Sequence, residues 1–410
     1  MSPRPFALHL MLATAALMSS RSGLPHWSAA WPNSNQTLLP ARNLLHPNLP
    51  ESLVADLTRY DAASVVRALD RAVVAAAGEL ADGVAAYRHH SYRRADDDFK
   101  AIWRSGSTAL LNHADAGAGS DSDIPALFVP SLVNRGWVLD LVPGQGMLSW
   151  LAKQGVRPFR IEWGPPGNAE RSFAIADYVR LRLEPALDEV LRVTGKPPVL
   201  VGYCMGGLVA LAGALRRPDA IRGLVLLATP WDFHADGPAR AQGIGAFYRA
   251  TRPFLGPLGA FPIDLIQALF AMHDPIVALR KFRRFASLDP DSAEARNFVA
   301  LEDWLNDGVA LTLPVADEAF LGWYEANDTC RLAWAVDGTL IDPAALSRPA
   351  LVVVPGGDKL VSPSSAAAII PALRDGARLD LPLGHIGMVV GRKAEKALWD
   401  PLAEWIRSAA

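Results

Sequence analysis

The sequence predicts an α/β fold built on a mostly parallel sheet. Short apolar runs of strand length alternate with helical segments from about residue 124, and the alternation returns after residue 349. A glycine-flanked cysteine at the end of one apolar run indicates a sharp turn from strand to helix. Strands that alternate with helices form right-handed βαβ units, and these units place their strands parallel in one sheet.

Residues 1–95 predict an N-terminal extension that is partly helical and partly irregular. The segment 22–50 is rich in Pro, Asn and Ser, whereas 53–89 is rich in alanine with helical spacing. The apolar run 10–18 is too short to span a bilayer, and a poor cleavage site follows it. We therefore expect an interfacial helix there rather than a signal peptide. Residues 92–112 are expected to be helical or irregular.

The strands of the predicted sheet follow one another along the chain. They are the apolar runs 126–129, 157–163, 199–201, 223–228, 351–354 and 377–381. Helices are predicted at 137–155 and at 172–194, where apolar residues recur every four positions. A closing helix carries its apolar face on Leu398, Leu402, Trp405 and Ile406. Each strand is thus followed by a segment that can cover the sheet.

The alternation of strands and helices stops after residue 232. The segment 233–342 carries aromatic and helical stretches, which indicates an inserted cap or lid over the catalytic end of the sheet. The predicted organisation is therefore an extension at 1–95, a first core segment at 96–232, the cap at 233–342 and a second core segment at 343–410.

Composition and charge narrow the class of function. The chain has 410 residues, of which 50% are hydrophobic and 20% are charged, and its net charge is −2 without a long Lys/Arg run. This balance suits a globular enzyme and argues against a nucleic-acid-binding role. Cys204 and Cys330 are the two cysteines, so neither a disulfide framework nor a cysteine-rich zinc site is predicted. No metal or organic cofactor is implied, and a lone cysteine at a turn suits a reducing cytoplasm.

The segment Gly202-Tyr-Cys-Met-Gly206 has the pattern of a nucleophile elbow, with cysteine in the place of the commoner serine. In such a turn, Cβ atoms at Gly202 and Gly206 would collide with neighbouring backbone. The helix that begins after Cys204 directs free amides and its positive dipole end toward the sulfur, which favours the thiolate. Because short patterns also arise by chance, the assignment depends on partners further along the chain.

Two such partners follow in the order nucleophile, acid, histidine that α/β-hydrolases use. Asp358 lies just after the 351–354 strand, and His385 lies just after the 377–381 strand. Both stand at the strand ends where parallel sheets bind ligands. Asp232 and Asp337 are weaker candidates for the acid. The sequence thus predicts a catalytic triad of Cys204, His385 and Asp358.

An oxyanion hole is expected from two backbone amides. One belongs to Met205, the residue after the nucleophile, and the other comes from the loop 131–134 after an earlier strand. Val133 is the preferred donor in that loop, and Leu132 is the alternative one position away.

Five blocks of the sequence, in order, resemble polyhydroxyalkanoate synthases of the α/β-hydrolase superfamily. They are residues 130–141, 202–207, 227–233, 357–363 and 384–390. The resemblance covers about residues 85–408. The short chain and the Gly384-His-Ile-Gly387 segment are most similar to the two-subunit (class III) type.

The resemblance implies polymerisation of (R)-3-hydroxyacyl-CoA on Cys204. His385 would deprotonate the thiol, which takes the acyl group as a thioester and releases CoA. The hydroxyl of a second acyl unit would then attack the thioester, while Asp358 supports the histidine or activates that hydroxyl. CoA enters as part of the substrate. The family also implies a cytoplasmic homodimer at the surface of a polyester granule, and it leaves open whether an accessory synthase subunit is needed.

Two other classes of function compete with this interpretation. The same triad could deliver the acyl group to water, as in a thioesterase or a polyester depolymerase, and the outcome depends on how dry the cap keeps the site. A granule-associated protein without catalytic activity is disfavoured, because Cys204, Asp358 and His385 are all present.

Overall fold

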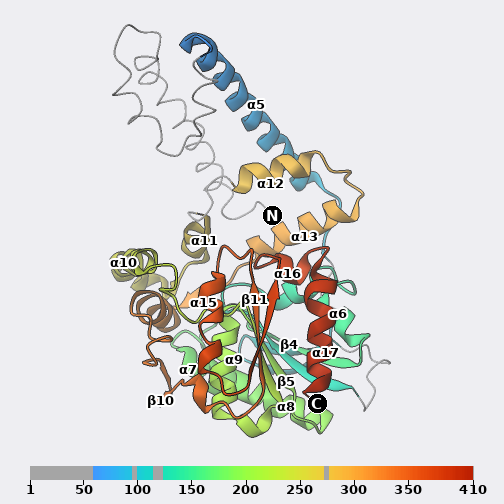
Figure 1. The fold of residues 1–410 in the computed structure, drawn as a ribbon, viewed down its shortest axis with the longest axis vertical. Helices are drawn as coiled ribbons and strands as arrows, with labels where there is room; N and C mark the ends of the chain where they lie inside the picture. Colours follow the sequence, from blue (N-terminus) through green and yellow to red (C-terminus); the bar gives the residue numbers. More distant parts are fainter. Residues whose placement is uncertain (1–58, 95–98, 114–122, 272–276, 410) are drawn as a thin grey trace. The chain divides into compact units, whose positions relative to one another are not determined.

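The computed structural model describes residues 59–94, 99–113, 123–271 and 277–409 (Figure 1). The described residues divide into two compact units, one drawn from Met1–Tyr92 and Phe270–Val299 and the other from Arg93–Leu269 and Ala300–Ala410. The predicted apolar run 10–18 and irregular segment 22–50 lie outside the described residues.

The second unit is built on a twisted sheet whose eight strands, within the described residues, follow the order β1-β2-β4-β3-β5-β6-β11-β12. The strands are β1 Ala101–Ser105, β2 Thr108–Asn112, β3 Ile124–Val129, β4 Val156–Glu162, β5 Val199–Tyr203, β6 Gly223–Leu227, β11 Ala350–Pro355 and β12 Gly376–Leu381. From β4 to β12 every neighbouring pair is parallel, whereas β1 and β2 add an antiparallel edge. The predicted α/β fold is confirmed.

The expectation of a helical or irregular segment at 92–112 was wrong, because this stretch contains the hairpin β1–β2. Gly106 has φ 56° in the turn, and a Cβ there would overlap the Glu170 carboxylate. Strand β2 is an apolar run of only a few residues, buried along most of its length. Periodicity alone does not separate so short a run from buried helix or loop.

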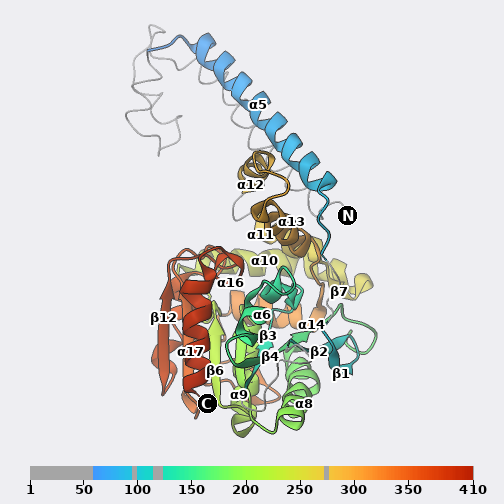
Figure 2. The ribbon, with the colours of Figure 1, turned by 90° about the vertical axis from the view of Figure 1, so that its right-hand side faces the viewer.

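Helices cover both faces of this sheet. Helices α8 (Glu184–Thr194) and α9 (Met205–Arg216) pack on one face, and α6 (Met147–Ala152) and α17 (Asp400–Ser408) pack on the other (Figures 1 and 2). Because both faces are covered, the central strands read as continuous apolar runs rather than as alternating ones. The predicted closing helix buries Leu398, Leu402 and Ile406, whereas Trp405 is only partly buried.

Two predicted helices differ in detail. The segment 137–155 forms a 3-10 turn, η1 Gly136–Asp140, and the short helix α6, because the Pro143-Gly144 pair and Gly146 interrupt it; Gly144 has φ 79°. The segment 172–194 forms α7 Ile175–Tyr178, a π-helical stretch η2 Val179–Leu183 and α8, one continuous helical run.

The segment 233–342 is mainly helical. Its elements are α10 Pro238–Leu255, η4 Gly256–Leu258, α11 Ile263–Ala271, α12 Val277–Ala286, α13 Ala293–Asn306, α14 Leu313–Asp317 and the π-helix η5 Glu318–Glu325, with two-residue strands β7 Ala260–Phe261, β8 Leu311–Thr312, β9 Ala335–Val336 and β10 Thr339–Leu340. In the second unit, α10 and η5 pack together, and Tyr248 and Arg252 of α10 both bind Asp317. The domain boundaries given above stay predictions.

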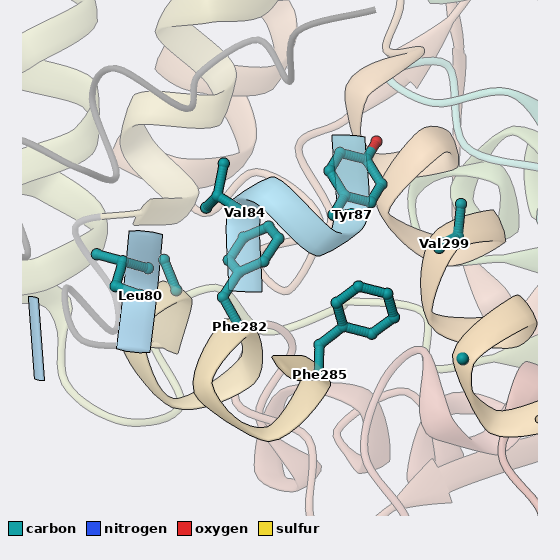
Figure 3. Close-up of a cluster of buried hydrophobic side chains, with 8 residues drawn as sticks. Leu80, Val84, Tyr87, Phe282, Phe285 and Val299 are labelled. Carbon is teal, nitrogen blue, oxygen red and sulfur yellow. The ribbon is translucent and has the colours of Figure 1, made fainter. Parts of the chain in front are cut away.

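The first unit is held by the packing of α5 (Ala62–His89) on α12. Leu80, Val84 and Tyr87 of α5 form a buried apolar cluster with Phe282 and Phe285 (Figure 3). Helix α5 confirms the predicted helical spacing where the residues are described. None of the described helices combines the length and the apolar character that crossing a membrane requires.

Candidate active site

Cys204 occupies a strained turn between β5 and α9. Its backbone angles are φ 55° and ψ −129°, a conformation that residues other than glycine seldom adopt. Two backbone hydrogen bonds hold it there: the Cys204 amide donates to the Leu227 carbonyl oxygen (2.9 Å), and the Gly207 amide donates to the Cys204 carbonyl oxygen (2.9 Å). These two bonds therefore help to hold Cys204 in its strained conformation.

The glycines around the cysteine are required by close backbone contacts. A Cβ on Gly202 would lie 2.8 Å from the Gly206 carbonyl oxygen, and a Cβ on Gly206 would lie 2.6 Å from the Pro130 carbonyl carbon. These contacts confirm the predicted crowding. Gly207, which the sequence analysis did not single out, is equally constrained, because a Cβ there would overlap the Thr229 side chain. The second glycine of the Gly206-Gly207 pair is the signal that could have found it.

Asp358 and His385 meet beside this turn from the ends of two neighbouring strands. Asp358 follows β11, His385 follows β12, and the Nδ1 atom of His385 lies 2.6 Å from Oδ2 of Asp358. The other carboxylate oxygen, Oδ1, accepts the amides of Leu360 (2.8 Å) and Val361 (3.0 Å). These two amides fix the carboxylate so that Oδ2 faces the imidazole.

The electrostatic surroundings of His385 favour its protonated form. Burial by itself disfavours the imidazolium, but the negative charge of Cys204 and the hydrogen bonds to Asp358 and Cys204 outweigh it and raise the pKa of His385 to about 10. The structure thus brings the three predicted residues together, with His385 hydrogen-bonded to both Asp358 and Cys204. A pKa of about 10 favours the imidazolium form of His385 at neutral pH.

The two amides expected to form the oxyanion hole come from elements that adjoin the cysteine. Met205 is the first residue of α9, so its N–H has no partner within the helix. Gly206 packs against the backbone of Val129 and Pro130, which places the start of the 130–134 loop next to the turn. The Val133 amide donates a long hydrogen bond to Ser131 Oγ (3.4 Å). Both donors stay predictions.

The competing carboxylates have other partners. Asp232 accepts hydrogen bonds from the His234 amide and the Asn327 side chain, both at 2.8 Å, and so anchors a loop. Asp337 lies in the β9–β10 turn and forms an ion pair with Arg216 at 3.5 Å. Of these carboxylates, Asp358 is the one hydrogen-bonded to His385.

Two tyrosines near the cysteine were missed by the sequence analysis. The Tyr203 ring stacks on the His385 imidazole, with centroids 5.1 Å apart and planes inclined by 29°, and its hydroxyl donates to the His385 carbonyl oxygen at 3.2 Å. Burial and the charge of Cys204 raise the pKa of Tyr324, in η5, to about 12. Tyr203 directly precedes Cys204, but its contact with His385 and the proximity of Tyr324 depend on the tertiary structure, so no local pattern predicts them.

Within the described ranges, no three His, Cys, Asp or Glu side chains gather as a set of metal ligands.

Cys330 is exposed, and the pKa of its thiol is raised by partial burial and by Asp232. Cys204, by contrast, is hydrogen-bonded to His385.

A family model described as the alpha/beta hydrolase fold matches residues 163–379, which is more than half of the chain. The chain belongs to the α/β-hydrolase family. The match spans the cysteine turn and Asp358.

Curated relatives confirm the resemblance to polyhydroxyalkanoate synthases. The poly(3-hydroxyalkanoate) polymerase subunit PhaC of Haloferax mediterranei is 26% identical over 312 residues, which cover 75% of this chain and 63% of the relative. The subunits of the same name from Haloarcula marismortui and Synechocystis are 26% identical (74% of this chain, 66% of the relative) and 28% identical (69% and 77%). The matched region spans less than two thirds of the two haloarchaeal proteins.

Proposed function

We propose that this α/β-hydrolase is an acyltransferase that polymerises (R)-3-hydroxyacyl groups from CoA thioesters through a covalent intermediate on Cys204. The observation that carries the proposal is the 2.6 Å contact between His385 and Asp358 beside a strained cysteine. Support also comes from relatives that are named poly(3-hydroxyalkanoate) polymerases.

In the first step, His385 accepts the proton of the Cys204 thiol, and the thiolate attacks the thioester carbonyl carbon. The new carbon–sulfur bond forms as the bond to the CoA sulfur breaks, and the imidazolium returns the proton to the departing CoA thiolate. The amides of Met205 and Val133 are proposed to donate to the oxygen that becomes negative during the attack. The free energy changes little, because one thioester replaces another.

In the second step, the hydroxyl of another 3-hydroxyacyl unit attacks the acyl group on Cys204. The neutral imidazole of His385 takes the hydroxyl proton, an ester bond forms, and the Cys204 thiolate leaves. Asp358 holds Nδ1 of His385, so that Nε2 is the nitrogen that exchanges protons in both steps.

The experiment is incubation of the purified protein with (R)-3-hydroxybutyryl-CoA while free CoA thiol and the acyl product are followed together. Thiol release with insoluble polyester supports the polymerase, provided that Cys204→Ala abolishes it. Cys330→Ala is the matched control, because it removes the exposed cysteine and should retain the activity. Release with only free 3-hydroxybutyrate would instead identify a thioesterase.

The partners follow from this proposal. A homodimer at the surface of a cytoplasmic polyester granule, with or without an accessory synthase subunit, is the assembly that we infer. Sedimentation of the purified chain before and after addition of substrate tests the homodimer. The apolar run 10–18 is proposed to anchor the protein at the granule surface, and normal granule targeting after deletion of residues 1–25 would contradict that role.

A further inference from the structure

Tyr203 makes two separate contacts with the residue that is proposed to move protons. It is the last residue of β5 and precedes Cys204, its side chain is buried, and its ring stacks on the imidazole of His385 at 5.1 Å. Its hydroxyl donates to the backbone carbonyl oxygen of the same histidine at 3.2 Å. One side chain therefore supports both the ring and the backbone of His385.

We propose that Tyr203 is a positioning residue for His385, whose ring stabilises the imidazolium and whose hydroxyl fixes the loop after β12. This inference rests on the proposed function in one respect only, namely that His385 transfers protons.

The stacked ring favours positive charge on the imidazole. The face of a phenol ring is electron-rich, and a cation within about 6 Å of the centroid is attracted to it, more strongly where water is excluded. The other groups that act on the His385 charge are Cys204, at the start of α9, and Asp358, after β11. Burial and the charges of these two groups raise the pKa of Tyr203 well above its usual value, so the phenol stays neutral and remains a donor.

The hydroxyl of Tyr203 acts on the loop that carries His385 rather than on the imidazole. Strand β5 carries the cysteine, whereas His385 lies in the loop after β12, which is separated from β5 by two other strands of the sheet. The hydrogen bond from Tyr203 ties that loop to the end of β5. The distance between thiol and imidazole then depends on one local contact as well as on the packing of the whole sheet.

Two variants test the ring contact and the hydroxyl contact separately. Tyr203→Phe removes the hydroxyl and keeps the ring, whereas Tyr203→Leu removes both. Tyr248→Phe is the matched control, because it removes the hydroxyl of another buried tyrosine, bonded to Asp317 at 2.6 Å, from helix α10. Protonation of His385 is followed without substrate by NMR of the ¹³C-labelled imidazoles, with the resonance assigned by its loss in His385→Gln.

Tyr203→Leu is expected to lower the midpoint of the His385 titration by about half to one pH unit. Tyr203→Phe should leave the midpoint of the His385 titration unchanged but slow CoA release about fivefold. That factor is the rate change expected when the free energy of one typical hydrogen bond is lost. Tyr248→Phe should change neither quantity. If Tyr203→Leu does not fold, the CoA release rate and the His385 midpoint of Tyr203→Phe still test the role of the hydroxyl.

An unshifted midpoint in Tyr203→Leu would overturn the role of the ring. A CoA release rate in Tyr203→Phe equal to that of Tyr248→Phe would overturn the role of the hydroxyl. The titration uses no substrate, so it reports the effect of the Tyr203 ring even if the protein proves inactive toward 3-hydroxyacyl-CoA. Failure of this inference and failure of the proposed function are therefore distinguishable.

Discussion

Replacement of Asp358 by asparagine should disable the histidine while leaving the fold intact. Oδ1 of Asp358 accepts the amides of Leu360 and Val361, and an asparagine oxygen can keep both of these bonds. Its NH₂ group must then occupy the position of Oδ2 and face Nδ1 of His385. Because an amide NH₂ only donates, Nδ1 must become the acceptor, and the proton moves to Nε2.

An imidazole protonated on Nε2 cannot accept the proton of the Cys204 thiol. The corresponding change in a serine protease costs roughly 10⁴-fold in rate, and we expect CoA release to fall by about 10³-fold or more. Loss of the negative charge should also lower the pKa of His385, since Asp358 contributes to raising it. Stability should change little, because the buried hydrogen bonds to the two amides are kept.

The assay compares the first turnover of CoA release with the steady-state rate. If Asp358 acts through His385, both rates fall together, because both chemical steps use the imidazole. Asp317→Asn is the control, as it alters a carboxylate in α14 bound by Tyr248 and Arg252. A normal first turnover with a slow steady state would refute this reasoning and show that Asp358 acts on the second hydroxyl instead.

Three further predictions follow from the structure. Gly206→Ala should lower the free energy of unfolding in urea by about 1–3 kcal/mol, because the added Cβ overlaps backbone atoms. Gly243→Ala, in open space within α10, is the control and should raise the free energy of unfolding slightly. Equal effects of the two substitutions would contradict the crowding around Gly206. Arg182→Met should cost about 3–5 kcal/mol by leaving the Glu170 carboxylate buried without its partner at 2.6 Å, and simultaneous Glu170→Gln should recover part of this. CoA release should persist up to about pH 9 and fall as pH rises through the His385 pKa of about 10; a fall near pH 7 would contradict a stabilised imidazolium.

Most of the parallel sheet could be predicted from the sequence because its strands are buried on both faces. Runs such as 199–201 and 351–354 are apolar throughout, and the helical segment 172–194, with apolar residues every four positions, stands directly before the first of them. The β1–β2 hairpin could not be predicted, because its strands are short and its edge strand β1 lacks a continuous apolar pattern. Its turn depends on Glu170, a tertiary partner that is distant in sequence.

The cysteine turn is the part of the site that local sequence encodes most fully. Gly202 and Gly206 are required by backbone contacts within or next to the same strand–helix unit, so their spacing is visible in the chain. The support given by Tyr203 to His385 joins residues 182 positions apart and depends on the sheet being assembled. No spacing rule could have identified it.

The central claim is that an acyl group is bound covalently to Cys204. The most direct measurement is rapid acid quenching of the protein with (R)-3-hydroxybutyryl-CoA, followed by digestion and mass spectrometry of the peptides that carry the two cysteines. We predict an added 3-hydroxybutyryl group on the Cys204 peptide, absent from the Cys330 peptide and abolished in His385→Gln. CoA release without acylation of Cys204 would contradict the account.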